Sequence, residues 1–257
     1  MAVRVKALGT AGELIRGHSD ARAHFAQYIP PKSLTSTTAP TDENIIARVI
    51  SLALNSKIPK EQRAALYTIQ SYLFSNNEVQ RAIASTAAPT PNDEISLGRQ
   101  LVKAWLDWET GDEWKTVAAL NVFYYLLDGN LSVKETLLKI PAHYATTGPS
   151  QHVDDSLFSH LIAFAFKAIQ TQVSHQIQIA FLKVLAQWLD DCDAALKYFL
   201  HSTQNLNMVG CLICFQTHTK LIDMVSSNAT NIQVSGIACI IVGECLQVKG
   251  CVTNNRP

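Results

Sequence analysis

Apolar side chains along the chain recur at the spacing of an α-helix and not at the alternating spacing of a strand. Three stretches show this periodicity, with steps of three, four or seven residues. Their apolar residues are Leu66, Ile69 and Leu73; Leu120, Phe123, Tyr124 and Leu127; and Leu182, Leu185 and Leu189. No convincing alternating segment bounded by hairpin turns accompanies them. The pattern predicts an almost entirely α-helical chain.

Prolines separate the apolar stretches and do not fall inside them. They are Pro30, Pro31, Pro40, Pro59, Pro89, Pro91, Pro141 and Pro149. Because proline lacks a backbone donor and clashes with the preceding helical turn, these positions predict helix boundaries. The largest predicted loops are Pro30–Pro40, Thr86–Asn92 and Pro141–Val153. The segment Ser132–Glu135 matches a capping box, which predicts a helix start at the serine, ahead of Leu137–Ile140.

A pair of small or apolar residues recurs inside the strongly apolar stretches. The pairs are Ala7-Leu8, Ala65-Leu66, Ala119-Leu120, Phe181-Leu182 and Gly236-Ile237, which gives intervals of 58, 54, 62 and 55 residues. One helical hairpin cannot cover its own apolar face, whereas stacked repeats cover each other. We therefore predict an all-α, armadillo/HEAT-like right-handed helical solenoid with about five repeats. The alternative is an irregular helical bundle in which the spacing is fortuitous.

Composition narrows the function classes. The 257 residues carry 21 Lys+Arg and 21 Asp+Glu, a net charge of zero, which argues against binding of nucleic acid or of a membrane surface through a basic patch. Only 16% of residues are charged, so part of the surface is expected to be covered by a partner. Apolar runs such as Leu161–Phe166 and Ile237–Val242 are much shorter than the roughly 20 residues of a membrane span, and no signal peptide is recognisable. The sequence predicts an intracellular protein.

Six cysteines in such a chain are too sparse for a disulfide framework, so we expect free thiols. Cys211 and Cys214, with His218 after them, match half of a zinc site or a redox pair. A second ligand pair at zinc spacing is missing, because Cys239 and Cys245 lie six residues apart in a very apolar helix. We interpret these cysteines as small apolar core residues.

Other candidate chemistry has structural explanations. Acidic residues cluster near predicted helix ends, where they cap helices or stay in solvent; they are Glu109, Asp112, Glu113, Asp154, Asp155, Asp190, Asp191 and Asp193. The eight histidines form no metal-binding motif, the nearest approach being His152 with Asp155 and His160. Trp105, Trp108 and Trp114 are expected to seal a core. The sequence therefore predicts no catalytic, cofactor-binding or metal-binding residues.

Several blocks of the sequence resemble a known family. The blocks are Arg4–Leu8 with Ile15–Gly17, Arg63–Tyr67 with Tyr72–Phe74, Ser96–Leu101 with Trp114–Leu120, Leu185–Cys192 with Ala195 and Phe199–His201, and Gln233–Ala238 with Gly243–Cys245. In order and spacing they resemble helices of the armadillo-like globular head of the general vesicular transport factor family, golgin-type vesicle tethers of the ER–Golgi route. The resemblance implies a head fragment over residues 1–250 and a non-family tail over 251–257.

The resemblance also implies a function. It indicates a non-catalytic interaction module without cofactor that docks vesicles before fusion in ER–Golgi or intra-Golgi transport. Rab-family GTPases, SNAREs and Golgi matrix proteins would be its partners, in the cytoplasm and peripherally on the Golgi membrane. The chain begins at what looks like an interior helix of the head and lacks the heptads of a coiled coil, so we expect a partial head whose uncovered ends favour a homodimer.

Two other function classes stay open at this point. An armadillo-type adaptor such as a nuclear-import receptor lines its groove with repeated Trp and Asn. Trp114 and Asn121 have that spacing, although the corresponding positions near Leu66 and Leu182 lack the pair. An all-α enzyme would use the carboxylate clusters or the Cys211–Cys214 motif.

Overall fold

The computed structural model describes residues 2–27, 45–88, 96–141, 156–171, 173–201 and 232–253. The regular structure of these ranges is α-helical, and extended backbone pairs there in one isolated antiparallel bridge, between Pro141 and Ser156. The all-α class is confirmed. The predicted loop Pro30–Pro40 lies outside the described residues, as do most of Thr86–Asn92 and Pro141–Val153.

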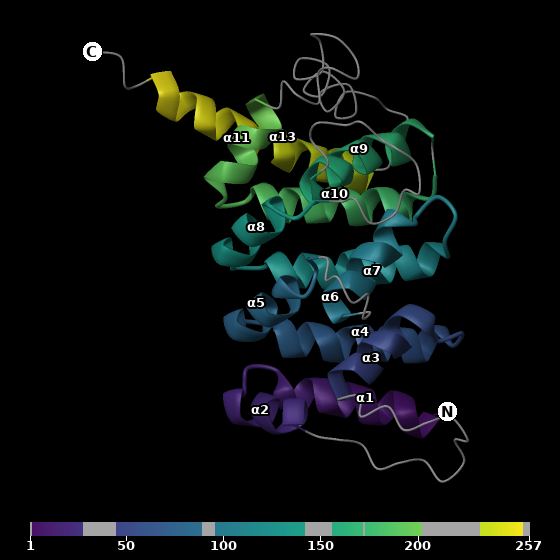
Figure 1. The fold of residues 1–257 in the computed structure, drawn as a ribbon. Coiled ribbons are helices and arrows are strands. Elements are labelled where there is room, and N and C mark those ends of the chain that lie inside the picture. The colour runs from purple at the N-terminus through teal and green to yellow at the C-terminus, as the bar shows by residue number, and fades with distance from the viewer. Residues whose placement is uncertain are drawn as a thin grey trace.

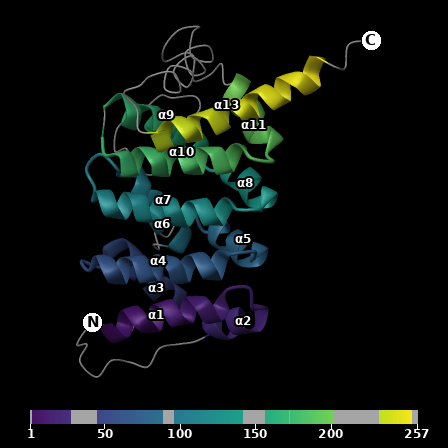
Figure 2. The same cartoon turned by 180° about the vertical axis from the view of Figure 1, so that it is seen from behind.

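Long helices stack side by side in chain order and form a ladder (Figure 1). These ladder helices are α1 (Ala2–Ile15), α4 (Pro59–Leu73), α7 (Glu113–Leu127), α10 (His175–Leu189) and α13 (Ile232–Thr253). Each contacts the next one, and Figure 2 shows them as successive rungs. All five repeat pairs of the sequence lie in ladder helices, so the repeat that the sequence predicts corresponds to one rung.

Shorter helices form two further rows beside the ladder. The edge helices lie at one end of the rungs (Figure 1) and are α2 (Ser19–Gln27), α5 (Asn77–Ser85), α8 (Leu131–Leu138) and α11 (Asp193–His201). The cover helices are α3 (Ile45–Asn55), α6 (Leu97–Leu106) and α9 (Leu157–Gln170), which pack on α4, α7 and α10 respectively. In the three middle repeats, a cover, a ladder and an edge helix are all described, and this arrangement makes an armadillo-like solenoid, as expected.

The core lies between the ladder and cover helices and is rich in aromatic rings. Trp105 of α6 is fully buried, and its ring meets those of Phe123 and Phe181 edge-on at centroid distances of 6.0 and 6.4 Å. Trp108 is also buried and contacts Phe181 at 5.8 Å. Edge-to-face rings add to the stabilisation that burial provides. The sealing role predicted for these two tryptophans is confirmed, while Trp114 is half-buried against the core.

The turns after the ladder helices repeat a backbone feature. Among the described residues the backbone becomes left-handed at Gly17, Ser75, Gly129 and Asp191, with φ angles of 75°, 50°, 62° and 47°. Each of these residues lies two positions after the last residue of a ladder helix. Their spacing is 58, 54 and 62 residues, which equals the first three intervals between the sequence pairs. The first four repeats therefore have the register that the sequence predicts.

Substitutions at these turns should change stability in opposite directions. A left-handed backbone costs a residue with a side chain about 1–2 kcal/mol, whereas glycine adopts it freely. We expect Gly129→Ala to lower the free energy of unfolding by about 1 kcal/mol and Ser75→Gly to raise it by about 0.5 kcal/mol. Urea denaturation followed by circular dichroism measures both changes. A loss of stability in Ser75→Gly would contradict this explanation of the turns.

Polar side chains tie three of the four edge helices to the following ladder helix. In α2, α5 and α8 the fourth residue donates a hydrogen bond to the backbone carbonyl of the C-cap residue, which directly follows the next ladder helix. The donors and acceptors, with their N···O distances, are Arg22 and Phe74 (2.5 Å), Gln80 and Asp128 (3.1 Å), and Lys134 and Asp190 (2.5 Å). Carbonyls at a helix C-terminus lack partners inside the helix, so these donors satisfy them. In α11 the corresponding residue is the buried, apolar Leu196.

The start of α8 differs from the prediction. The helix begins at Leu131, and its N-cap is Asn130, whose side chain accepts a hydrogen bond from the Val133 backbone amide at 3.3 Å. Ser132 therefore lies within the first turn, and the capping box that its sequence suggested is wrong. The physical reason is the left-handed turn at Gly129, which ends the preceding helix and places Asn130 in the capping position.

The fifth repeat pair is also displaced. Of the α13 side chains that the structure describes, the fully buried ones are Val234, Ala238 and Ile241, which have the same spacing as Ile177, Phe181 and Val184 of α10. The partner of Phe181-Leu182 is therefore Ala238-Cys239, because Gly236 is exposed. The sequence placed the pair two residues early because α13 is apolar on all sides.

The division of the chain at residue 250 stays a prediction. Helix α13 continues past it to Thr253.

Candidate interaction surface

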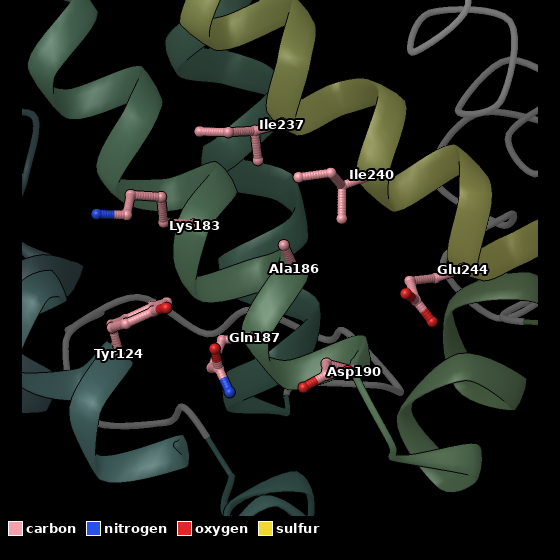
Figure 3. Close-up of a pocket in the computed structure, with 8 residues that line it drawn as sticks. All are labelled: Tyr124, Lys183, Ala186, Gln187, Asp190, Ile237, Ile240 and Glu244. Carbon is pink, nitrogen blue, oxygen red and sulfur yellow. The ribbon is translucent and has the colours of Figure 1, made fainter. Parts of the chain in front are cut away.

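An open pocket of about 290 Å³ lies on the ladder where α7, α10 and α13 meet (Figure 3). Its lining residues are Tyr124, Lys183, Ala186, Gln187, Asp190, Ile237, Ile240 and Glu244. Three consecutive rungs contribute to it, so the pocket exists only in the stacked solenoid. Nothing in the sequence pattern indicates that these residues line a common pocket.

One wall of the pocket is apolar. Ile237 and Ile240 project from α13 toward Ala186 of α10 (Figure 3), and Ile240 is 57% exposed. The buried side of α13 carries Val234 and Ala238. Ile237 lies at the edge of that side and packs partly against the core, whereas Ile240 points away from it. Ala186, Ile237 and Ile240 together form an apolar wall in a concave surface, a combination that favours contact with another molecule.

The opposite wall is polar and carries both charges. The Lys183 ammonium lies 5.2 Å from the centre of the Tyr124 ring, a cation–π contact between α10 and α7. Asp190 and Glu244 add two carboxylates to the rim, against one lysine. Burial raises the pKa of Tyr124, and the negative charges of Asp128 and Asp190 raise it further. Since the phenol stays neutral at physiological pH, the rim has a net negative charge.

The carboxylates that the sequence singled out are dispersed over the helix ends. Asp112 caps α7 by accepting a hydrogen bond from the Trp114 amide at 2.9 Å, and Asp193 lies in the first turn of α11. Glu109 forms an ion pair with Lys167 at 2.6 Å. The helix-end interpretation is thus confirmed for Asp112 and Asp193.

The other carboxylates that the sequence singled out lie at helix ends and turns or outside the described residues. Glu113 accepts a hydrogen bond from the Ser174 hydroxyl. Asp190 is the C-cap of α10, and Asp191 forms the left-handed turn after it. Asp154 and Asp155 lie outside the described residues.

The Cys211–Cys214 motif and His218 lie outside the described residues, and so does His152. Of the cysteines whose side chains are described, Cys192 is buried and Cys239 is exposed. Within the ranges the structure describes, no group of three His, Cys, Asp or Glu side chains could hold a metal ion. None of the helices found there is long and apolar enough to cross a bilayer.

Two buried ionisable groups lie together at the junction of α8, α10 and α11. Burial lowers the pKa of Lys134, against the opposing effect of Asp190, and burial raises the pKa of the Cys192 thiol. The Lys134 ammonium donates to the Asp190 carbonyl, and the Trp188 indole donates to the Lys134 carbonyl at 3.1 Å. Both bonds hold α8 onto α10, so we assign this cluster a packing role.

Asn121, half of the candidate Trp–Asn pair, lies on the ladder. Its amide donates to the Val117 carbonyl within its own helix at 2.9 Å. In the neighbouring rungs the positions equivalent to Asn121 hold Tyr67 and Lys183. An asparagine ladder that binds a peptide backbone is therefore not repeated over these rungs.

Comparison with known proteins identifies the family. Residues 18–249 match the family described as Uso1/p115-like vesicle tethering protein, head region. The whole chain is 26% identical to golgin candidate 6 of Arabidopsis thaliana over 275 aligned residues, which cover 28% of that protein. General vesicular transport factor p115 of Rattus norvegicus and of Homo sapiens is 24% identical over 79% of the chain, and the match covers 20% of each.

The chain thus spans less than a third of the length of these relatives. The family model covers nine-tenths of the chain. The described part of the chain folds as the helical solenoid presented above. The resemblance found in the sequence is confirmed. The chain belongs to the family of Uso1/p115-like vesicle tethering proteins, and it corresponds to the head region of that family.

Proposed function

We propose that this chain is a non-catalytic protein-interaction module of a vesicle tethering factor, which docks membranes before fusion in ER–Golgi or intra-Golgi transport. Family membership supports the tethering role. The observation that carries the interaction role is the open pocket with its exposed Ile240. Of the carboxylates that the sequence singled out, Asp112 caps a helix, and Glu109 and Glu113 bind neighbouring side chains, which supports a structural role for these three groups.

The pocket defines the kind of segment that it would bind. Ile237 and Ile240 offer an apolar contact, and Asp190 and Glu244 on the rim attract positive charge. The best fit is an aliphatic side chain flanked by Lys or Arg, displayed by a partner protein. The names of the relatives, a golgin and a general vesicular transport factor, favour partners on the Golgi.

The partners that we propose are a Rab-family GTPase, SNAREs and Golgi matrix proteins. The protein would act from the cytoplasm and attach peripherally to the Golgi membrane through these partners. The neutral net charge supports attachment through proteins over direct attachment to anionic lipids.

A pull-down from cytosol with the whole chain as bait tests this function. Wild-type protein should enrich early-secretory-pathway proteins, and Ile240→Asp should reduce their recovery about tenfold, because it places a charge on the apolar wall. Leu131→Asp is the matched control, since Leu131 is 49% exposed on α8, away from the pocket. Equal recovery by wild type and Ile240→Asp would exclude the pocket as the binding site.

The same experiment separates the other function classes. Recovery of nuclear-import cargo in place of secretory proteins would favour the adaptor function. Metal analysis of the purified chain addresses an enzyme, for which stoichiometric zinc or iron would be the supporting result.

A further inference from the structure

The pocket lies at one end of a longer surface on the ladder. Figure 2 shows the ladder helices from the side opposite to the cover helices. In the register of the left-handed turns, Tyr124 of the pocket corresponds to Gln70 in α4 and to Ala186 in α10. All three side chains are half-buried, so they line the same partly exposed side of the ladder. The surface that carries the pocket thus continues from α10 over α7 to α4.

Aromatic rings and cations follow one another along this surface. The rings of Tyr124 and Tyr125 meet edge-on, with centroids 5.1 Å apart, and Tyr124 also contacts the Lys183 ammonium as described above. Farther along, the Arg16 guanidinium lies 5.1 Å from the centre of the Phe74 ring. Burial raises the pKa of Tyr125, as does Tyr124, whereas the nearby positive charge of Arg16 opposes this change. These five residues, which we call the aromatic strip, connect the pocket to the turns after α4 and α1.

The aromatic strip has the composition of a binding surface. Phe74 is 38% exposed, and arginine, tyrosine and phenylalanine are enriched where proteins contact each other. In the part of the chain that the structure describes, no carboxylate forms an ion pair with Arg16, although Arg4 and Lys167 each have one. A guanidinium that lies beside two aromatic rings and is open to solvent is suited to bind a carboxylate of another molecule.

The charge of this surface changes sign along the ladder. The residue directly after each of the first four ladder helices is, in chain order, Arg16, Phe74, Asp128 and Asp190. Together with Glu244 on the pocket rim, the two aspartates make the α13 end negative, while Arg16 makes the α1 end positive. A ligand that follows the surface from one end to the other is complementary only if its own charges have the reverse order.

The distance between the two ends defines the length of such a ligand. Packed helices lie about 8–10 Å apart, and an extended chain advances about 3.3 Å per residue, so about three residues span one rung. The pocket lies between α10 and α13, and the contact of Arg16 with Phe74 lies between α1 and α4, three rungs away. About nine residues of extended chain therefore join the two ends.

We propose that the pocket and the aromatic strip together bind one extended segment of a partner protein with opposite charges at its two ends. An acidic residue of the segment pairs with Arg16. About nine residues away, an aliphatic residue next to Lys or Arg enters the pocket, and apolar residues between them pack on Tyr124 and Tyr125. The inference rests on the proposed docking function, to which it adds the kind of ligand: an extended segment in place of the surface of a folded domain.

Selection from a phage-displayed library of random peptides, about 14 residues long, with the whole chain as bait, tests this inference. Wild type should enrich peptides with Asp or Glu about eight to ten residues from an aliphatic residue that adjoins Lys or Arg. Arg16→Glu should select Lys or Arg in place of the acidic residue, and should bind the peptides selected by wild type about tenfold more weakly. Arg16→Gln should remove the preference without reversing it.

Arg48→Glu is the matched control, because Arg48 is an exposed arginine on the cover helix α3 and the same substitution there should leave the selected peptides unchanged. Thermal melting verifies that the variants stay folded. No enrichment over an unrelated bait, or an acidic preference that persists in Arg16→Glu, would overturn the inference. If the library gives no such peptides while Ile240→Asp still reduces the recovery of secretory proteins in the pull-down, the docking function stands and the extended ligand is rejected.

Discussion

Leu120→Asp is expected to unfold the solenoid. Leu120 is fully buried in α7, the middle rung of the ladder, which contacts both α4 and α10. The change removes about 2–3 kcal/mol of apolar burial and places a carboxylate where no charge partner is available. The combined loss of about 5 kcal/mol or more is comparable to the whole stability of a typical domain. Urea denaturation at 25 °C should show little or no native signal.

The control for this variant is the same substitution at an exposed site. Leu131→Asp changes a 49% exposed residue at the first position of α8, where a carboxylate also interacts favourably with the helix dipole. Its free energy of unfolding should stay within about 0.5 kcal/mol of the wild type. If Leu120→Asp melted at the wild-type temperature, α7 could not be the buried middle rung.

Gln80→Leu is expected to have the second largest effect. Gln80 is fully buried at the junction of three helices. Its amide nitrogen lies 3.2 Å from the Leu73 carbonyl, 3.0 Å from the Tyr125 carbonyl and 3.1 Å from the Asp128 carbonyl. Its oxygen accepts from Asn130 at 2.8 Å. Leucine fills similar space but leaves these buried groups without their partner, so we expect a loss of about 3 kcal/mol.

Gln70→Leu separates the hydrogen bonds from the general effect of replacing glutamine. Gln70 lies in α4 and is only half-buried, so the same substitution there should change the free energy of unfolding by less than about 0.5 kcal/mol. Both variants are measured by urea denaturation. Equal stability of the two variants would show that the carbonyls at the end of α7 need no donor from α5.

The sequence alone was sufficient for the helical class and for most of the repeat register. Helical periodicity and proline boundaries are local properties, so Pro59 marks the first residue of α4 as expected. The first three intervals agree with the left-handed turns because each rung has one strongly apolar side that must face the core. At α13 the periodicity was uninformative, since apolar residues surround the helix and both Gly236 and Ala238 fit the pattern.

Local patterns were less reliable at helix ends. Ser132 and Glu135 have the letters of a capping box, yet Asn130 caps α8. The end of one helix determines the start of the next. The left-handed turn at Gly129 follows the end of α7 and places Asn130 at the start of α8. Similarly, nothing in the sequence distinguished Gln80 and Lys134 as buried donors. Their equivalence is visible only after the edge helices are aligned by the turns before them.

Only the tertiary structure decided which apolar residues are available to partners. Ile240 has the same character as residues buried in the core, and the sequence cannot separate it from them because exposure depends on neighbouring rungs. Stacking of α10 on α13 buries Val234 and leaves Ile240 on the pocket wall. The sequence by itself thus determined the helices and their repeat. The surfaces that can bind another molecule were fixed by packing, which joins residues from rungs more than 50 positions apart.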